Sequence, residues 1–126
     1  MNAGRMLFIG AISGLLTVVL GAFGAHGLEG AVPATHLEWW QKAVHYQGLH
    51  SLALLAGGLL ALQLPNNRWI ASSGWLFLTG MLLFCGSLYL LTLTGQRSLG
   101  MITPIGGSAF IAGWFCLAMA ARGINR

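Results

Sequence analysis

The sequence is 126 residues long, 56% hydrophobic and only 6% charged, with six Lys and Arg against two Asp and Glu. A water-soluble domain carries about a quarter of its residues as charged side chains, so this chain has too few to surround a core in water. The formal net charge of +4 reflects the scarcity of acids rather than a basic run, and it gives no indication of a nucleic-acid-binding face. We therefore expect one domain, residues 1–126, whose surface mostly contacts a lipid bilayer.

The charged residues divide the chain into four uncharged windows, each of which predicts one transmembrane helix. The windows are 23 to 28 residues long and cover residues 6–28, 43–67, 69–96 and 98–121. About 20 helical residues cross a hydrocarbon core, so each window can span once and none can span twice. The sequence thus predicts an all-α integral membrane four-helix bundle in antiparallel up-down order. The predicted spans are 6–25, 43–64, 70–93 and 99–121.

The first span has one alternative interpretation. Arg5 precedes an apolar run, and Ala22, Gly24 and Ala25 are small residues of the kind found at the cleavage site of a signal peptide. The apolar run of about 20 residues exceeds the usual signal-peptide core, which favours a retained span.

The connection between the first two spans contains a helix-start pattern. Thr35 and Glu38 have the spacing of a capping box. Trp39 and Trp40 follow, and indole rings favour the headgroup level of a membrane. We expect a short interfacial helix from about His36 that runs into the second span or bends once before it.

The fourth span begins with an irregular sequence around Pro104, followed by Gly106 and Gly107. A proline in the first helical turn explains the pattern most simply. The alternative is a broken helix of the kind that transporters use to expose backbone carbonyls.

Basic residues predict the orientation of the bundle. With four spans, one side of the membrane holds Arg5, Arg68, Arg122 and Arg126, and the other holds Lys42 and Arg97. This bias places both termini in the cytoplasm.

Polar residues in the four spans fall at a similar depth, in the half of the membrane away from the cytoplasm. Polar side chains in hydrocarbon are costly unless they find partners, so we expect them to meet between the helices. The predicted outer-leaflet cluster consists of His26, Tyr46, Gln47, His50, Ser87, Tyr89 and Thr103.

Two interpretations of this cluster remain open. It is either a hydrogen-bond network that fixes helix packing, or a binding site. In the second case His26 and His50 would ligate haem or a transition metal, or would hydrogen-bond a quinone. No nucleophile–base–acid set is visible, so we do not expect an enzyme.

Several short motifs carry a family resemblance. They are Phe23-Gly24-Ala25-His26-Gly27, Tyr46-Gln47 with His50, Gly86-Ser87-Leu88-Tyr89, Thr103-Pro104-Ile105-Gly106-Gly107, Phe110 and Gly113-Trp114. In these motifs the chain resembles the YgdD/YwdK-like small bacterial membrane proteins, the domain-of-unknown-function family 423, which is related to a small eukaryotic transmembrane protein. The resemblance implies a multi-pass protein of the bacterial inner (plasma) membrane and supplies no activity.

Two classes of function follow. The first is a non-catalytic accessory, assembly or structural subunit that contacts another membrane protein or a second copy of itself as a homo-oligomer. The second is a protein that binds a redox cofactor or metal, or that transports a small molecule as an oligomer.

Overall fold

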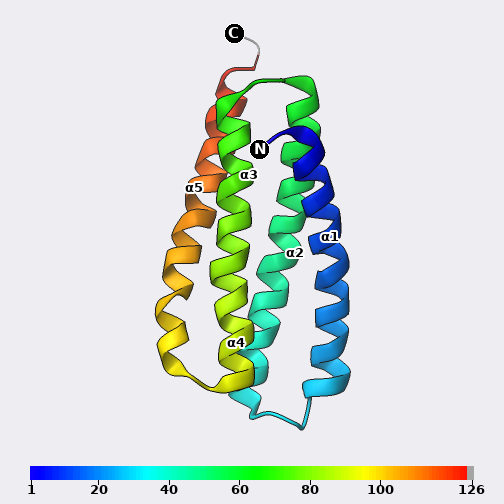
Figure 1. Ribbon diagram of the computed structural model, residues 1–126, viewed down its shortest axis with the longest axis vertical. Helices are drawn as coiled ribbons and strands as arrows, with labels where there is room; N and C mark the ends of the chain where they lie inside the picture. The colour runs from blue at the N-terminus through cyan, green and yellow to red at the C-terminus, as the bar shows by residue number, and fades with distance from the viewer. Residues whose placement is uncertain (125–126) are drawn as a thin grey trace.

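The computed structural model describes residues 1–124, and the secondary structure within that range is entirely helical. The helical elements are α1 (Ala3–Phe23), the π-helical turn η1 (Gly24–Leu28), α2 (Ala34–Gln63), α3 (Arg68–Gly80), the π-helical turn η2 (Met81–Cys85), α4 (Gly86–Thr94), the 3₁₀-helix η3 (Arg97–Met101) and α5 (Thr103–Arg122). They form four helical rods: α1 with η1, α2 alone, α3 with η2 and α4, and η3 with α5. The rods lie side by side along the long axis of the molecule (Figure 1). The start of α1, the α2–α3 turn and the end of α5 lie at the same end of the bundle (Figure 1).

The helices have the lengths that a bilayer requires. Within residues 1–124, three helical stretches are long and apolar enough to cross a membrane: Ala3–Leu28, Arg68–Thr94 and Arg97–Arg122. α2 is longer, at 30 residues, but it is less apolar because it carries polar side chains into the bundle. These include Gln47, His50 and Ser51, all of which are buried.

The start of α2 differs from the expectation. α2 begins at Ala34, one residue before Thr35, and Pro33 occupies the N-cap position without a side-chain cap. The predicted capping box is therefore wrong. Pro33 has an extended backbone, and its carbonyl accepts the first helical hydrogen bond from the Leu37 amide at 3.1 Å, so Thr35 lies inside the first turn. The predicted interfacial helix is not a separate element but the first turns of the unbroken α2.

The fourth rod follows the simpler of the two expectations for Pro104, and the third rod contains an irregularity that was not predicted. Pro104 lies in the first turn of α5, which then continues unbroken to Arg122, so the broken-helix alternative does not hold. The third rod contains the π-helical turn η2 between α3 and α4, a feature that accommodates one extra residue in a helix.

Each rod packs mainly against the rods that precede and follow it in the sequence, and the first and last rods do not pack along each other. α1 packs along α2, α5 packs along α3 and η2, and α2 packs against α3, η2 and α4 in the centre. Close approach depends on glycine: a Cβ at Gly10 would lie 3.0 Å from the Ser51 carbonyl oxygen, and one at Gly106 would overlap the Phe84 backbone. This order leaves one groove between α1 and α3–α4 and another between α2 and α5.

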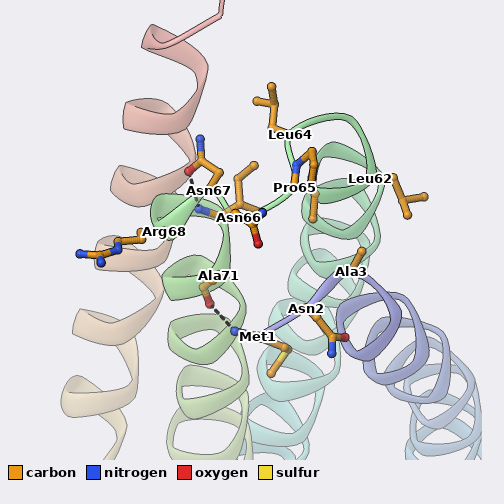
Figure 2. A pocket seen from close by; sticks show the side chains of 12 residues that line it. Met1, Asn2, Ala3, Leu62, Leu64, Pro65, Asn66, Asn67, Arg68 and Ala71 are labelled. Atoms are coloured by element: carbon orange, nitrogen blue, oxygen red, sulfur yellow. Dashed lines mark hydrogen bonds between the residues drawn. The ribbon is translucent and has the colours of Figure 1, made fainter.

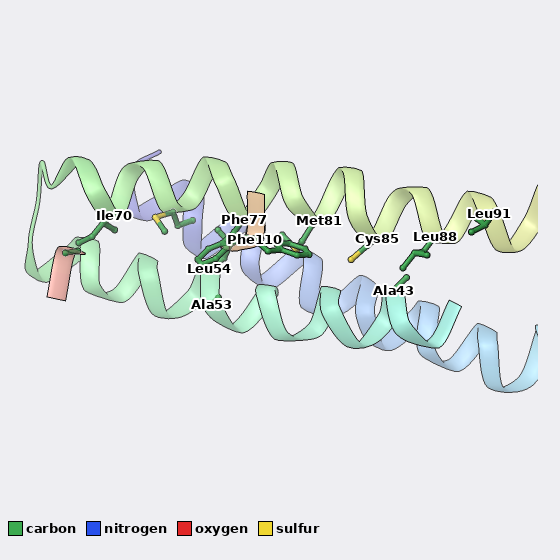
Figure 3. Packing of buried hydrophobic residues seen from close by; sticks show 12 residues of the cluster. Ala43, Ala53, Leu54, Ile70, Phe77, Met81, Cys85, Leu88, Leu91 and Phe110 are labelled. Carbon is green, nitrogen blue, oxygen red and sulfur yellow. The ribbon is translucent and has the colours of Figure 1, made fainter. Parts of the chain in front are cut away.

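The core forms a seam between α2 and the α3–α4 rod (Figure 3). The labelled side chains of Ile70, Phe77, Met81, Cys85, Leu88 and Leu91 line one side of this seam, and Phe110 of α5 joins them. Cys85 and Cys116 are free and buried.

The outer surface is apolar as well. Val18 on α1 is 73% exposed and Ile111 on α5 is 74% exposed, and many other large hydrophobic side chains are also exposed. A surface of this kind is unsuited to water and suits lipid acyl chains.

Candidate functional site

A chain of hydrogen bonds crosses the centre of the bundle. The Tyr89 hydroxyl of α4 donates to Gln47 Oε1 of α2 at 2.5 Å. Gln47 Nε2 then donates to the Ser13 carbonyl oxygen of α1 at 3.1 Å. The Ser51 hydroxyl lies 2.7 Å from the Ser13 hydroxyl, which donates to the Met81 sulfur at 3.3 Å. These five residues, the central network, tie α1, α2, η2 and α4 together.

Sequence reasoning identified Gln47 and Tyr89 but missed Ser13 and Ser51. A serine in an apolar helix gives a weak signal because its hydroxyl can bond to its own backbone, as Ser51 does to the Gln47 carbonyl at 2.7 Å. The usable signal was the spacing of Gln47 and Ser51 at i and i+4, which places them on one face of α2.

His50 lies beside the central network but uses different partners. Its Nδ1 lies 2.8 Å from the Tyr46 carbonyl oxygen, and the Trp114 indole N–H donates to its Nε2 at 3.1 Å. Because an indole nitrogen can only donate, Nε2 must be the acceptor. The hydrogen-bond network therefore assigns the neutral tautomer with its proton on Nδ1. The ring also stacks on Phe110, with centroids 3.6 Å apart.

The second candidate ligand, His26, lies elsewhere. It is exposed in η1, and the described structure gives it no hydrogen bond and no ring contact with His50. Both nitrogens of His50 are already engaged. Within residues 1–124 the structure therefore shows no contact between His26 and His50, and each nitrogen of His50 has another partner. His26 lies in η1, the π-helical turn that follows α1, and this turn was not predicted from the sequence.

The remaining predicted residues form two smaller groups. Ser87 and Thr103 join α4 to α5 through a hydroxyl–hydroxyl hydrogen bond of 2.6 Å. Since the Ser87 hydroxyl donates to the Phe84 carbonyl at 3.0 Å, Thr103 is the donor in that pair. Tyr46 packs its ring against Phe84, with centroids 4.7 Å apart, and its hydroxyl has no hydrogen-bond partner within the described chain.

Further contacts lie at the end of the bundle that holds the α4–η3 connection. His36 Nδ1 donates to the Thr92 carbonyl at 3.0 Å, and the Thr92 hydroxyl returns a bond to the His36 carbonyl at 3.1 Å. The Trp40 indole donates to the Leu20 carbonyl at 2.8 Å. The sequence placed His36 and Trp40 at the membrane interface; the structure adds that they fasten α2 to α4 and α1.

A cavity of about 550 Å³ lies at the opposite end, between the start of α1 and the α2–α3 turn (Figure 2). The Met1 amino group donates to the Ala71 carbonyl at 3.3 Å across it, and Asn67 caps α3. The Arg68 side chain points away from Met1 in Figure 2. The side-chain polar groups that line this cavity are therefore mainly amides, which gives it little capacity for acid–base chemistry.

Comparisons with known proteins found a matching family model and relatives that are named membrane proteins. Residues 20–107 match the family model described as "Protein of unknown function (DUF423)". The chain is 46% identical to the UPF0382 membrane protein YwdK of Bacillus subtilis, over 91% of this chain and 94% of that relative. It is 40% identical to the UPF0382 inner membrane protein YgdD of Escherichia coli K12, over 100% of this chain and 95% of that relative. No solved structure matches the chain.

Proposed function

The chain belongs to the DUF423 family of membrane proteins, and from this premise we propose that it is a non-catalytic accessory, assembly or structural subunit of the bacterial inner membrane. In this proposal the chain crosses the membrane four times as an antiparallel up-down bundle. Arg5, Arg68 and Arg122 support a cytoplasmic position for both termini, because basic residues concentrate on that side.

One observation carries the structural role: every fully buried side-chain nitrogen or oxygen within residues 1–124 has a hydrogen-bond partner. The fully buried polar side chains are thus satisfied by one another and by backbone carbonyls. Hydrogen bonds between transmembrane helices contribute about 0.6 to 2 kcal/mol each. A satisfied network such as Tyr89–Gln47–Ser13 therefore favours one packing of the helices over alternatives.

The surface supports an accessory role. The groove between α1 and α3–α4 is open to the surrounding lipid, and the lipid-facing side chains are predominantly apolar. A partner helix, or a second copy of the chain, would gain van der Waals contact there without displacing water. Haem or metal ligation by His26 and His50 forms no part of the proposal, since both nitrogens of His50 already have hydrogen-bond partners.

Native mass spectrometry tests the accessory role. A tagged chain at its natural expression level, released from membranes in a mild detergent, should appear with a second membrane protein or a second copy at fixed stoichiometry. Gln47→Leu, which breaks the central network, should reduce the assembled fraction, whereas the lipid-facing Val18→Ala should not. A bare 13.3 kDa chain under every mild condition would contradict the proposal.

A further inference from the structure

The groove between α2 and α5 differs in chemistry from the other surfaces of the bundle. Its volume is about 400 Å³, and no Asp, Glu, Lys or Arg is among the described residues that line it. The residues that determine its chemistry are Tyr46, His50, Phe84, Gly107, Phe110 and Trp114. Five of the ten lining residues carry aromatic rings, so π-faces and edges form much of the groove wall.

Three of the aromatic rings that line the groove are nearly parallel to one another. The His50 and Phe110 rings are stacked within 9° of parallel, and the Tyr46 ring is also within 9° of the Phe110 plane. Trp114 meets His50 edge-on, with centroids 5.9 Å apart, and is 43% exposed beside the groove. Aromatic walls favour a flat, conjugated ring, which can stack or make edge-to-face contacts with them.

The groove also holds an unused hydrogen-bond donor. The chain has two tyrosines, and only the Tyr89 hydroxyl finds a partner, Gln47, among the described residues. Since no fully buried polar atom lacks a partner, the unpaired Tyr46 hydroxyl must be accessible at the surface of the bundle, and the Tyr46 side chain lines this groove. A free hydroxyl in an apolar environment is costly, so an acceptor such as a carbonyl oxygen would bind it favourably.

We propose that the α2–α5 groove binds the ring of a membrane-soluble quinone. The ring lies beside Tyr46 and Trp114, and one quinone carbonyl oxygen accepts a hydrogen bond from the Tyr46 hydroxyl. The aliphatic tail lies along the lipid-facing side of α5 near Ile111. The absence of charged lining residues selects an uncharged ligand, and His50 keeps both of its existing hydrogen bonds. This site goes beyond the structural role proposed above, which requires no ligand.

A fluorescence titration tests the proposal. Decylubiquinone is added to the full chain in nanodiscs, and quenching of tryptophan emission is compared with a tryptophan octyl ester in nanodiscs without protein, which reports partition into lipid alone. We expect saturable quenching above this baseline. Tyr46→Phe retains the ring but removes the donor, and it should raise the Kd about five- to tenfold, as the loss of one hydrogen bond implies.

A matched pair of groove-filling variants locates the site. A Cβ at Gly107 meets only Phe84 ring atoms, at the ordinary contact distances of 3.8 and 3.9 Å, so the side chain of Gly107→Leu starts without a clash from a position that lines the α2–α5 groove. Gly86→Leu places the same side chain in the groove between α1 and α3–α4, where a Cβ meets nothing within 4 Å. Gly107→Leu should abolish saturable quenching, and Gly86→Leu should preserve it. Quenching no greater than the lipid baseline, or equal binding by wild type and Gly107→Leu, would overturn the proposal.

Discussion

A polar side chain inside a membrane helix must find its hydrogen-bond partners within the protein, and Gln47 and His50 do so differently. Gln47 bonds to Tyr89 and Ser13 on two other helices. His50 bonds to the backbone of its own helix and to the Trp114 indole on α5. Gln47 therefore links helices through both the oxygen and the nitrogen of its side-chain amide, and His50 links them through one ring nitrogen. For His50 this arrangement also fixes the position of a proton.

The tautomer of His50 gives the first prediction. Nitrogen-15 NMR of the histidine-labelled protein at neutral pH should show a protonated Nδ1 and an unprotonated Nε2 for His50, because the Trp114 indole can only donate. Trp114→Phe should change the His50 Nε2 resonance and leave that of His45, an exposed residue, unchanged. A proton on Nε2 in the wild-type protein would contradict the assignment.

At the scale of elements, two glycines next to each other in α5 have different roles. A Cβ at Gly106 would overlap the Phe84 backbone in η2, whereas one at Gly107 makes ordinary contacts with the Phe84 ring. Backbone atoms cannot move aside as a flexible side chain can. Gly106 is therefore the residue that sets how closely α5 approaches the third rod.

The comparison of these glycines gives the second prediction. Gly106→Ala should lower the free energy of unfolding in detergent by about 1–3 kcal/mol, the usual cost of overpacking. Gly107→Ala is the matched control and should change it by less than about 0.5 kcal/mol, as for a surface substitution. Equal effects of the two substitutions would show that α5 does not approach η2 at Gly106.

The sequence predicted the extent of the rods better than their internal detail. Three predicted spans, 6–25, 70–93 and 99–121, lie within helical stretches long and apolar enough to cross a membrane. Charged residues predict such limits well because each charge must lie outside the hydrocarbon. The π-helical turn η2 left no local signal, since it accompanies the tertiary contact between Phe84 and Gly106.

The sequence predicted some residues of the candidate site and missed others. Gln47 and Tyr89 could be singled out because amide and phenol groups are conspicuous in apolar windows. Ser13 and Ser51 could not, because a serine in a helix can satisfy itself locally. The placement of His26 could not be predicted either, because this residue lies on the exposed side of η1, a π-helical turn whose Gly24 and Leu28 are buried.

At the scale of the whole molecule, the rods follow one another in space as they do in sequence. α1 and α5 are the outer rods, and α2 with α3–α4 forms the centre. The most polar rod, α2, therefore occupies a central position, where its buried polar side chains Gln47, His50 and Ser51 meet neighbours rather than lipid. Both acidic residues, Glu29 and Glu38, lie near the end of the bundle opposite to Arg5 and Arg68.

This charge distribution gives the third prediction. Single cysteines are introduced into a variant that lacks Cys85 and Cys116, at the exposed turn positions Pro65→Cys and Gln96→Cys. A maleimide that cannot cross the inner membrane should label Gln96→Cys in intact cells and Pro65→Cys only after the membrane is broken. The reverse pattern would place both termini outside the cytoplasm, and labelling of both positions in intact cells would rule out a transmembrane rod between them.

The central claim is that polar side chains meet one another inside a bundle surrounded by lipid and thereby fix its packing. A double-mutant cycle between Gln47 and Tyr89, measured by reversible unfolding in mixed micelles, tests it most directly. We predict a coupling free energy of about 0.6–1.7 kcal/mol, the range of hydrogen bonds between membrane helices. Tyr89→Phe should destabilise the wild type but have little effect in Gln47→Leu, and Tyr46→Phe should be nearly neutral in both. Zero coupling, with equal effects of Tyr89→Phe and Tyr46→Phe, would contradict the account.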